Sequence, residues 1–194
     1  MDLPIVIRTF FAIEIPDTIK SLIAELLKSL QKQSRARSIH WVRPENLHIT
    51  LQFLPAVQWA DVNRLLAQTG AAIKGFHCPD LTLGPIQTFP NLRYPRVIVL
   101  DVTPHVELMA LANLLGRGIQ AAGYPIELRP FRGHLTLARL HDPRMGQRLK
   151  LDEVVLPVIP PIQVREIIYY RSEPEAPKSK YTLLGRVTLP IDLY

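Results

Sequence analysis

The alternation of apolar and polar residues along the chain predicts strands and amphipathic helices in turn. Residues 5–14 are dominated by β-branched and aromatic side chains, which is typical of a strand. Pro16 and Asp17 follow, and from there to about Gln33 apolar residues recur three and four positions apart, as on one face of a helix. The chain is therefore expected to open with a strand and a helix.

Similar patterns predict the remaining elements. Helices are expected over residues 58–74 and 104–122, and Gly123 ends the second of these in the manner of a C-terminal cap. Strands and helices that do not alternate regularly indicate an α+β fold with antiparallel sheets. Strands are expected over 47–54, 76–83, 96–102, 132–140, 162–171 and 181–189, with a Pro-rich turn region over 84–95 and a polar loop over 172–180.

One motif, His-x-Thr-Leu, occurs twice, each time in a strand pattern that follows a predicted helix. Side chains two positions apart on a strand share a face, so His48 lies beside Thr50, and His134 beside Thr136. The two motifs are about half a chain apart. We therefore expect one domain over 1–194 in which a duplicated helix–strand unit forms two similar lobes that face each other across a cleft.

The same alternation assigns the opposite faces of these strands to the core. In the first strand, the residues expected to be buried are Leu47, Ile49, Leu51 and Phe53. In the second, Leu135 and Leu137 are expected to be buried, and the alternation points Arg139 away from the histidine.

Two imidazoles and two hydroxyls that converge on one small volume suit the cleavage of a phosphodiester. A neutral His can remove a proton from water and a protonated His can donate one to the leaving oxygen, because this side chain titrates near neutral pH. The hydroxyls of Thr50 and Thr136 can donate hydrogen bonds to phosphate oxygens, and Arg139 could add a permanent positive charge. No carboxylate lies beside either His in the sequence, so no metal site is predicted.

The composition of the chain indicates which class of partner it binds and in which compartment it works. The 194-residue chain carries a net charge of +6, which favours polyanionic partners such as nucleic acid. Its single cysteine, Cys78, cannot form an internal disulfide, and the first residues lack the basic start and uninterrupted apolar stretch of a signal peptide. No apolar run is long enough to span a membrane, so a cytoplasmic protein without a membrane role is expected.

Nearly the whole chain carries a family resemblance, most specifically the stretch from Trp41 to Leu54 (WVRPENLHITLQFL). The chain resembles the two-histidine phosphoesterase superfamily, and within it the bacterial and archaeal RNA 2′,3′-cyclic phosphodiesterases, first called 2′-5′ RNA ligases. Further matching stretches are residues 8–12 (RTFFA), 95–98 (PRVI), 134–139 (HLTLAR), 170–172 (YRS) and Tyr181.

The resemblance implies a bilobal α+β fold and metal-independent opening of a 2′,3′-cyclic phosphate on RNA to a 2′-phosphomonoester. It also implies that His48 is the proton donor and His134 the proton acceptor. The chain departs from the family pattern at Pro55, at Gly133 and at Ser179-Lys180, where the family usually has Gly, Pro and Gly respectively. These departures concern loop shape and substrate fit and leave both histidines in place.

Aromatic residues are the remaining candidates for RNA contact. Of Phe10 and Phe11, one is expected in the core and the other could stack on a base, and the candidate is Phe11. Tyr181 is a second candidate of the same kind. The basic stretches 35–37 and 144–150 could help to hold an RNA backbone. Structural or surface roles are expected for the other histidines, which are His40, His77, His105 and His141.

Three alternative functions remain open from the residues. The same fold could serve as a non-catalytic RNA-binding module, although such a module would tolerate loss of one His. The same site could act on a small cyclic nucleotide, or could join RNA ends through 2′-5′ linkages, since ligation is the reverse of phosphodiester cleavage. No nucleotidyl-ligase Lys motif or Gly-rich phosphate loop is present, so no cofactor is expected. The sequence implies no protein partner, and we expect a monomer.

Overall fold

The computed structural model describes residues 5–33, 38–91, 93–127, 129–142, 144, 151–175 and 178–190. Within this part of the chain the fold is built from three α-helices and eight strands. The helices are α1 (Asp17–Gln33), α2 (Val62–Ile73) and α3 (His105–Ala121), with short 3₁₀ turns η1 (Pro44–Asn46), η2 (Trp59–Asp61) and η3 (Leu151–Glu153). The strands are β1 (Val6–Glu14), β2 (Ile39–Trp41), β3 (His48–Gln58), β4 (Thr82–Phe89), β5 (Val97–Thr103), β6 (His134–Leu140), β7 (Glu166–Glu175) and β8 (Lys178–Thr188).

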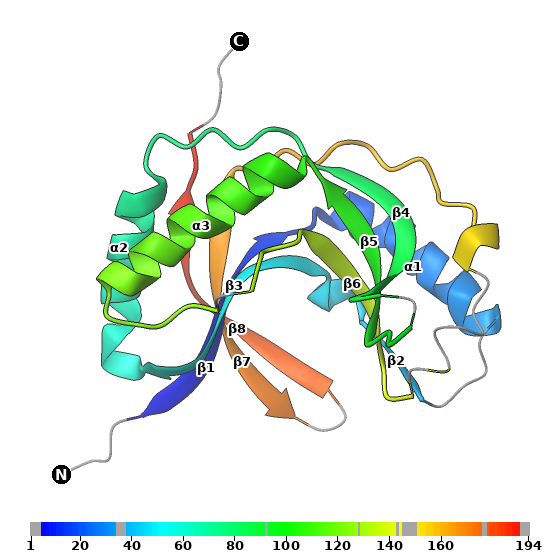
Figure 1. Cartoon of the computed structure of the whole chain (residues 1–194), viewed down its shortest axis with the longest axis horizontal. Helices are drawn as coiled ribbons and strands as arrows, with labels where there is room; N and C mark the ends of the chain where they lie inside the picture. Colours follow the sequence, from blue (N-terminus) through cyan, green and yellow to red (C-terminus); the bar gives the residue numbers. More distant parts are fainter. Residues whose placement is uncertain are drawn as a thin grey trace.

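The strands form two four-stranded sheets, and every neighbouring pair is antiparallel. Sheet A has the order β3-β1-β7-β8 and sheet B the order β2-β6-β5-β4. Helices α2 and α3 pack against each other on the side of sheet A, where α2 contacts β8 and α3 contacts β3 (Figure 1). This arrangement confirms the predicted α+β fold with antiparallel sheets.

The two sheets meet where β3 contacts β6, and these are the two strands that carry the His-x-Thr-Leu motifs. One continuous cluster of buried apolar residues, drawn from both sheets and all three helices, forms the core. Burial of this much apolar surface is the main stabilising term of such a fold. The two motif strands are therefore fixed relative to each other by a shared core.

Several predicted elements are confirmed nearly to the residue. The first strand and helix are β1 and α1, and the second motif strand is β6. Helix α3 begins one residue later than expected. Gly123, which follows it, has a φ of +84°, a backbone conformation that favours glycine and that ends helices.

Proline misled the prediction at two places. The first motif strand was expected to stop at Leu54, but β3 continues through Pro55 to Gln58, so α2 begins only at Val62. The predicted strand over 76–83 is wrong, because β4 covers Thr82–Phe89, within the stretch expected to be a turn region. Both β3 and β4 are edge strands, where a proline that lacks an N–H group interrupts no ladder between neighbours.

The polar loop predicted over 172–180 is also wrong where the structure describes it. Strands β7 and β8 extend into this stretch as a long hairpin. Glu173 lies opposite Lys180, and Arg171 lies opposite Thr182. Cross-strand pairs of opposite charge stabilise a hairpin whose residues look polar in sequence.

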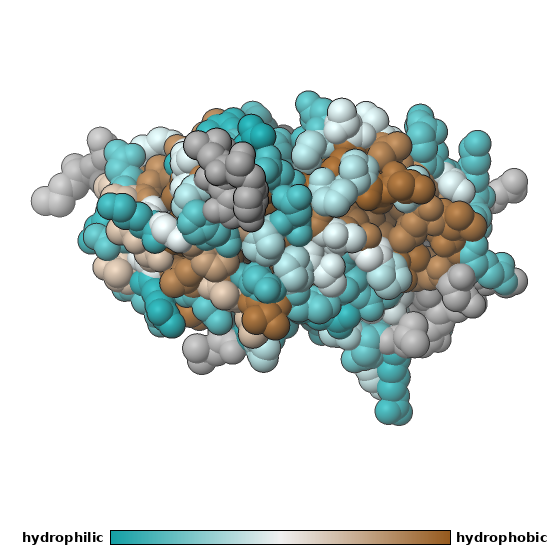
Figure 2. Space-filling model, turned by 90° about the horizontal axis from the view of Figure 1, so that it is seen from above, coloured by the Kyte–Doolittle hydropathy of each residue, from teal (hydrophilic) through white to brown (hydrophobic). Residues whose placement is uncertain are grey.

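The surface of the molecule is mixed in character. Figure 2 shows hydrophobic patches on the face seen from above, most of them towards one end of the molecule, among mainly hydrophilic side chains. No helix in the described residues is long and apolar enough to cross a membrane.

Candidate active site

The duplication extends to an irregularity of the backbone in both motif strands. In sheet A, Ala12 pairs with Thr50 but Phe11 pairs with Gln52, so Leu51 is the extra residue of a β-bulge. In sheet B, Val99 pairs with Thr136 but Ile98 pairs with Ala138, so the equivalent residue, Leu137, is extra. Each bulge falls on the Leu of a His-x-Thr-Leu motif, directly after the residues proposed to do chemistry.

The bulges correct the faces predicted from simple alternation. A β-bulge shifts the alternation by one residue, so every later side chain changes face. In β3, Phe53 is 38% exposed and Leu54 is buried, opposite to the prediction. In β6, Ala138 and Leu140 are buried and Arg139 is exposed.

Arg139 therefore lies on the same face as the histidines, and the prediction that it points away from His134 is wrong. Its positive charge acts on both rings, since repulsion from Arg139 contributes to lowering the pKa of His48 and that of His134. The side chain can thus act at the place where a phosphate would bind between the two histidines.

Both histidine rings are held in the same way by the backbone that precedes them. The Nδ1 atom of His48 lies 2.7 Å from the carbonyl oxygen of Asn46, and that of His134 lies 2.8 Å from the carbonyl oxygen of Arg132. A carbonyl oxygen only accepts, so Nδ1 carries the hydrogen in each ring. In its neutral form each ring then has Nε2 as the basic atom, which is the arrangement that a general base needs.

Burial lowers the pKa of both histidines. For His48, burial and, to a smaller degree, repulsion from Arg139 and His134 lower the pKa to about 4, against the opposing hydrogen bond to Asn46. For His134, burial is again the main cause, and Arg132 and Arg139 add to it. Because each charged ring would repel the other, the two groups titrate as a pair.

His48 lies in an aromatic enclosure. The ring of Phe10 is 4.8 Å from it between centroids, and the ring of Tyr181 meets it edge-on at 5.3 Å. A hollow of about 140 Å³ adjoins the ring and is lined by Glu14, Glu45, Asn46, Leu47, Tyr170 and Tyr181 in addition to His48.

His134 has different neighbours. Phe89 stacks on its ring at 5.1 Å between centroids, with 16° between the planes. The guanidinium of Arg132 lies 5.5 Å from the centroid of Phe89. Gln87 donates a hydrogen bond of 3.0 Å to Asp101, whose carboxylate is also 3.7 Å from Arg132.

Two carboxylates lie directly opposite the histidines across the strand pairs, and the local sequence gave no sign of them. Glu14 pairs with His48 in β1 and β3, and Asp101 pairs with His134 in β5 and β6. Only the register of the strands places them there. Asp101 raises the pKa of His134 against the dominant effect of burial. Glu14 accepts a hydrogen bond of 3.1 Å from Lys20, so its charge is partly neutralised.

The structure places the aromatic candidates for RNA contact in different surroundings. Phe11 is fully buried and stacks on Tyr169 at 4.1 Å, so it belongs to the core and is not available to a base. Phe10 is the aromatic residue of β1 that faces His48, although only 3% of it is exposed. Tyr181 is half-buried beside His48, and Thr50 and Thr136 are half-buried at alternating positions next to their histidines.

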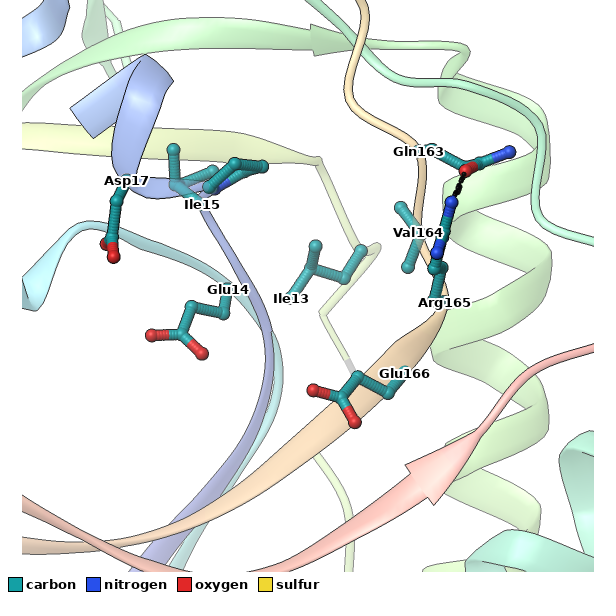
Figure 3. A pocket seen from close by; sticks show the side chains of 9 residues that line it. Ile13, Glu14, Ile15, Asp17, Gln163, Val164, Arg165 and Glu166 are labelled. Atoms are coloured by element: carbon teal, nitrogen blue, oxygen red, sulfur yellow. Dashed lines mark hydrogen bonds between the residues drawn. The ribbon is translucent and has the colours of Figure 1, made fainter. Parts of the chain in front are cut away.

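A further hollow of about 280 Å³ shares Glu14 with the site and lies where β1 ends and β7 begins (Figure 3). Three carboxylates line it, those of Glu14, Asp17 and Glu166. Its arginine, Arg165, donates a hydrogen bond of 3.0 Å to Gln163. Because like charges repel a phosphate and no His is present, this hollow is not the place for the phosphodiester chemistry.

The described residues contain no group of three or more His, Cys, Asp or Glu side chains that could hold a metal ion. Of the basic stretches 35–37 and 144–150, considered above for RNA contact, only Arg144 is described, and it is exposed; residues 35–37 and 145–150 lie outside the described residues.

Comparison with known proteins identifies the family. Residues 13–99 match the family described as LigT like phosphoesterase. A curated RNA 2′,3′-cyclic phosphodiesterase of Archaeoglobus fulgidus is 31% identical over 133 residues, which are 69% of this chain and 72% of the relative. The chain belongs to the LigT-like phosphoesterase family. A second relative of the same name, from Bacillus subtilis, is also 31% identical over 133 residues, which are 67% of this chain and 69% of that relative.

Two solved structures share the fold over almost the entire chain. The crystal structure of E. coli LigT complexed with 3′-AMP superposes with a TM-score of 0.71 at 28% identity, covering 95% of this chain and 99% of that one. A crystal structure from Thermus thermophilus, that of TT0787, gives a TM-score of 0.69 at 26% identity, with coverages of 94% and 97%. The family resemblance found in the sequence is therefore confirmed.

Proposed function

We propose that this LigT-like phosphoesterase hydrolyses the 2′,3′-cyclic phosphate at the end of an RNA to a 2′-phosphomonoester, without a metal ion. The observation that carries the proposal is the pair His48 and His134, held on adjoining strands with both Nδ1 atoms bound to backbone carbonyls. The names of the curated relatives support the substrate, since they are RNA 2′,3′-cyclic phosphodiesterases.

The proposed reaction is an in-line displacement at phosphorus. Nε2 of neutral His134 removes a proton from water, whose oxygen forms a new bond to phosphorus. The bond from phosphorus to the 3′-oxygen breaks, and protonated His48 donates its proton to that oxygen. The product keeps the phosphate on the 2′-oxygen, and a proton exchange between the rings and solvent restores the starting state.

The electrostatics of the site fit an anionic substrate. A pKa of about 4 means that His48 is neutral in the free protein at neutral pH. A phosphate bound between the rings brings a negative charge, which favours the protonated form of an adjacent imidazole. Arg139 and the hydroxyls of Thr50 and Thr136 can stabilise the charge that develops on the non-bridging oxygens.

The test uses an oligonucleotide that ends in a 2′,3′-cyclic phosphate, incubated with the protein in EDTA. We expect full activity after chelation and a product whose phosphorus NMR signal is that of a 2′-monoester. Activity lost in EDTA and restored by zinc or manganese would contradict the metal-independent mechanism. Accumulation of the 3′-monoester would mean that His48 and His134 exchange roles, and the absence of any turnover would overturn the proposed substrate.

A further inference from the structure

Two hollows share one feature, since each is lined in part by the residues that precede a motif histidine. The smaller one, beside His48, is lined in part by the three residues that precede it. The larger one, which we call the α3 hollow, is lined by the three residues that precede His134 and by the first two turns of α3. Its volume is about 370 Å³ and its lining residues are His105, Val106, Met109, Phe131, Arg132 and Gly133.

We propose that the α3 hollow binds the nucleobase of the nucleotide whose cyclic phosphate is opened. This inference rests on the proposed function and adds to it the site that would recognise the base. A cavity of this volume falls within the roughly 300–1,000 Å³ of typical small-ligand sites, whereas the hollow beside His48, at about 140 Å³, falls below it.

The lining of the α3 hollow suits the flat, apolar faces of a base. Val106 is 68% exposed and Met109 is 40% exposed, so apolar surface lies open to solvent there. Exposed apolar residues alone prove little, since Val155 is 90% exposed and lines none of these hollows. The difference is that Val106 and Met109 share a concave site with the aromatic ring of Phe131.

Arg132 connects the α3 hollow to the chemistry. Its carbonyl oxygen accepts the hydrogen bond from His134, while its guanidinium lies over Phe89, the ring that stacks on His134. A guanidinium is a stacking partner for bases and a positive charge for the phosphate that follows. A base in the hollow would therefore leave its own ribose and cyclic phosphate next to His134.

The charges of the other hollows favour the same assignment. Glu14 and Glu45 line the hollow beside His48, and three carboxylates line the hollow of Figure 3. The lining of the α3 hollow contains the cation of Arg132 and no carboxylate, and Asp101, outside that lining, lies 3.7 Å from Arg132 and 3.2 Å from Nε2 of His105. Since Lys20 pairs with Glu14, the hollows differ in which groups line their walls: a phosphate meets a cation at the α3 hollow and carboxylates at the other two.

The test separates binding of the base from the reaction at phosphorus. The variants Val106→Gln and Met109→Gln make the hollow polar while keeping good helix formers on α3. The matched control is Val155→Gln, at an exposed valine outside the hollow. Each protein is assayed with adenosine 2′,3′-cyclic phosphate and with the 2,3-cyclic phosphate of methyl riboside, which has no base.

We expect Val106→Gln and Met109→Gln each to raise KM for the adenosine compound about fivefold and to leave kcat unchanged. A fivefold change corresponds to the partial loss of one contact with the base. KM for the methyl riboside compound and both values for the control variant should stay at the wild-type level. Equal effects on the two substrates, or none on either, would overturn the base site.

Failure of the proposed function gives a different result. If the wild-type protein opens neither of these small cyclic phosphates nor the cyclic phosphate end of the oligonucleotide, the proposed function is overturned. The base site is then decided by calorimetric binding of adenosine 2′-monophosphate against methyl riboside 2-phosphate. Tighter binding of the adenosine compound that is lost in Met109→Gln supports the site, and equal binding of the two compounds overturns it.

Discussion

The surroundings of His48 and those of His134 are built on one backbone pattern but differ in chemistry. Both rings follow a carbonyl that accepts from Nδ1, both precede a β-bulge, and both face a carboxylate on the neighbouring strand. Around His48 the other neighbours are the rings of Phe10 and Tyr181. Around His134 they are one stacked ring and a cluster of charged and polar groups.

The difference decides which ring holds a proton more easily. For His48, burial among aromatic rings is dominant and lowers the pKa to about 4. For His134, burial is again the main cause but lowers the pKa by less than for His48; Arg132 and Arg139 add to the effect, and the carboxylate of Asp101 opposes it. In the free protein a proton is therefore more stable on His134, and the donor role proposed for His48 depends on the charge of the bound phosphate. Duplicating a motif has thus duplicated the geometry without making the two groups interchangeable.

The largest effect is expected from removing either member of the pair. His48→Ala and His134→Ala should each lower kcat/KM for a cyclic phosphate end by at least about 10²-fold, because each ring moves a proton in the transition state. The double variant should be little worse than either single one, since the two groups act as a unit. Turnover is measured by phosphate-product NMR, and circular dichroism checks the fold.

His77→Ala is the control for that experiment, because this residue is exposed and lines neither the hollow beside His48 nor the α3 hollow. It should turn over at the wild-type rate. Near-normal activity in either His48→Ala or His134→Ala would rule out a paired mechanism.

A smaller effect is expected at Arg139, the charge that the two surroundings share. Arg139→Gln should lower kcat/KM about tenfold by removing a cation next to the phosphate. Because Arg139 lowers the pKa of both rings, its loss should also raise both pKa values and move the optimum of the pH–rate profile to higher pH.

The matched control for Arg139 is Arg165→Gln, because Arg165 is exposed and is not among the charges that shift the pKa of either histidine. It should leave the pH profile in place. A pH optimum that stays unchanged in Arg139→Gln, or moves to lower pH, would mean that Arg139 does not act on the pair.

The amino-acid sequence was sufficient for those parts of the site that depend on local order. A period of two placed each threonine beside its histidine, and the repetition of the motif was enough to single out the two histidines as a pair. The same period failed beyond Leu51 and Leu137, because a bulge is a property of two paired strands and leaves no mark on one of them. Arg139 and Phe53 were assigned to the wrong faces for this reason.

The carboxylates show a second limit. Glu14 and Asp101 lie far from the histidines in sequence and meet them only through strand register. Register depends on how whole sheets assemble around the core, which the pattern of a single segment does not reveal. Edge position is a third feature that one segment does not reveal: the strand predicted to end at Leu54 continues through Pro55 along the edge of sheet A.

The smallest effect, and the sharpest test of the comparison, concerns Asp101. Asp101→Asn keeps an oxygen that can accept from Gln87 but removes the negative charge. Since that charge raises the pKa of His134, its loss should lower that pKa further. The alkaline limb of the kcat/KM profile should then move to lower pH, because His134 is the ring that is protonated more easily in the free protein. NMR titration of the imidazole signals measures the change in the pKa of His134 directly. The counterpart in the other half is Glu14→Gln, and there the titration of His48 should move less, because the charges that act on the pKa of His48 are those of Arg139 and His134. Equal shifts for the two variants would mean that the halves do not differ in their electrostatics, and the unequal protonation argued from the structure would be wrong.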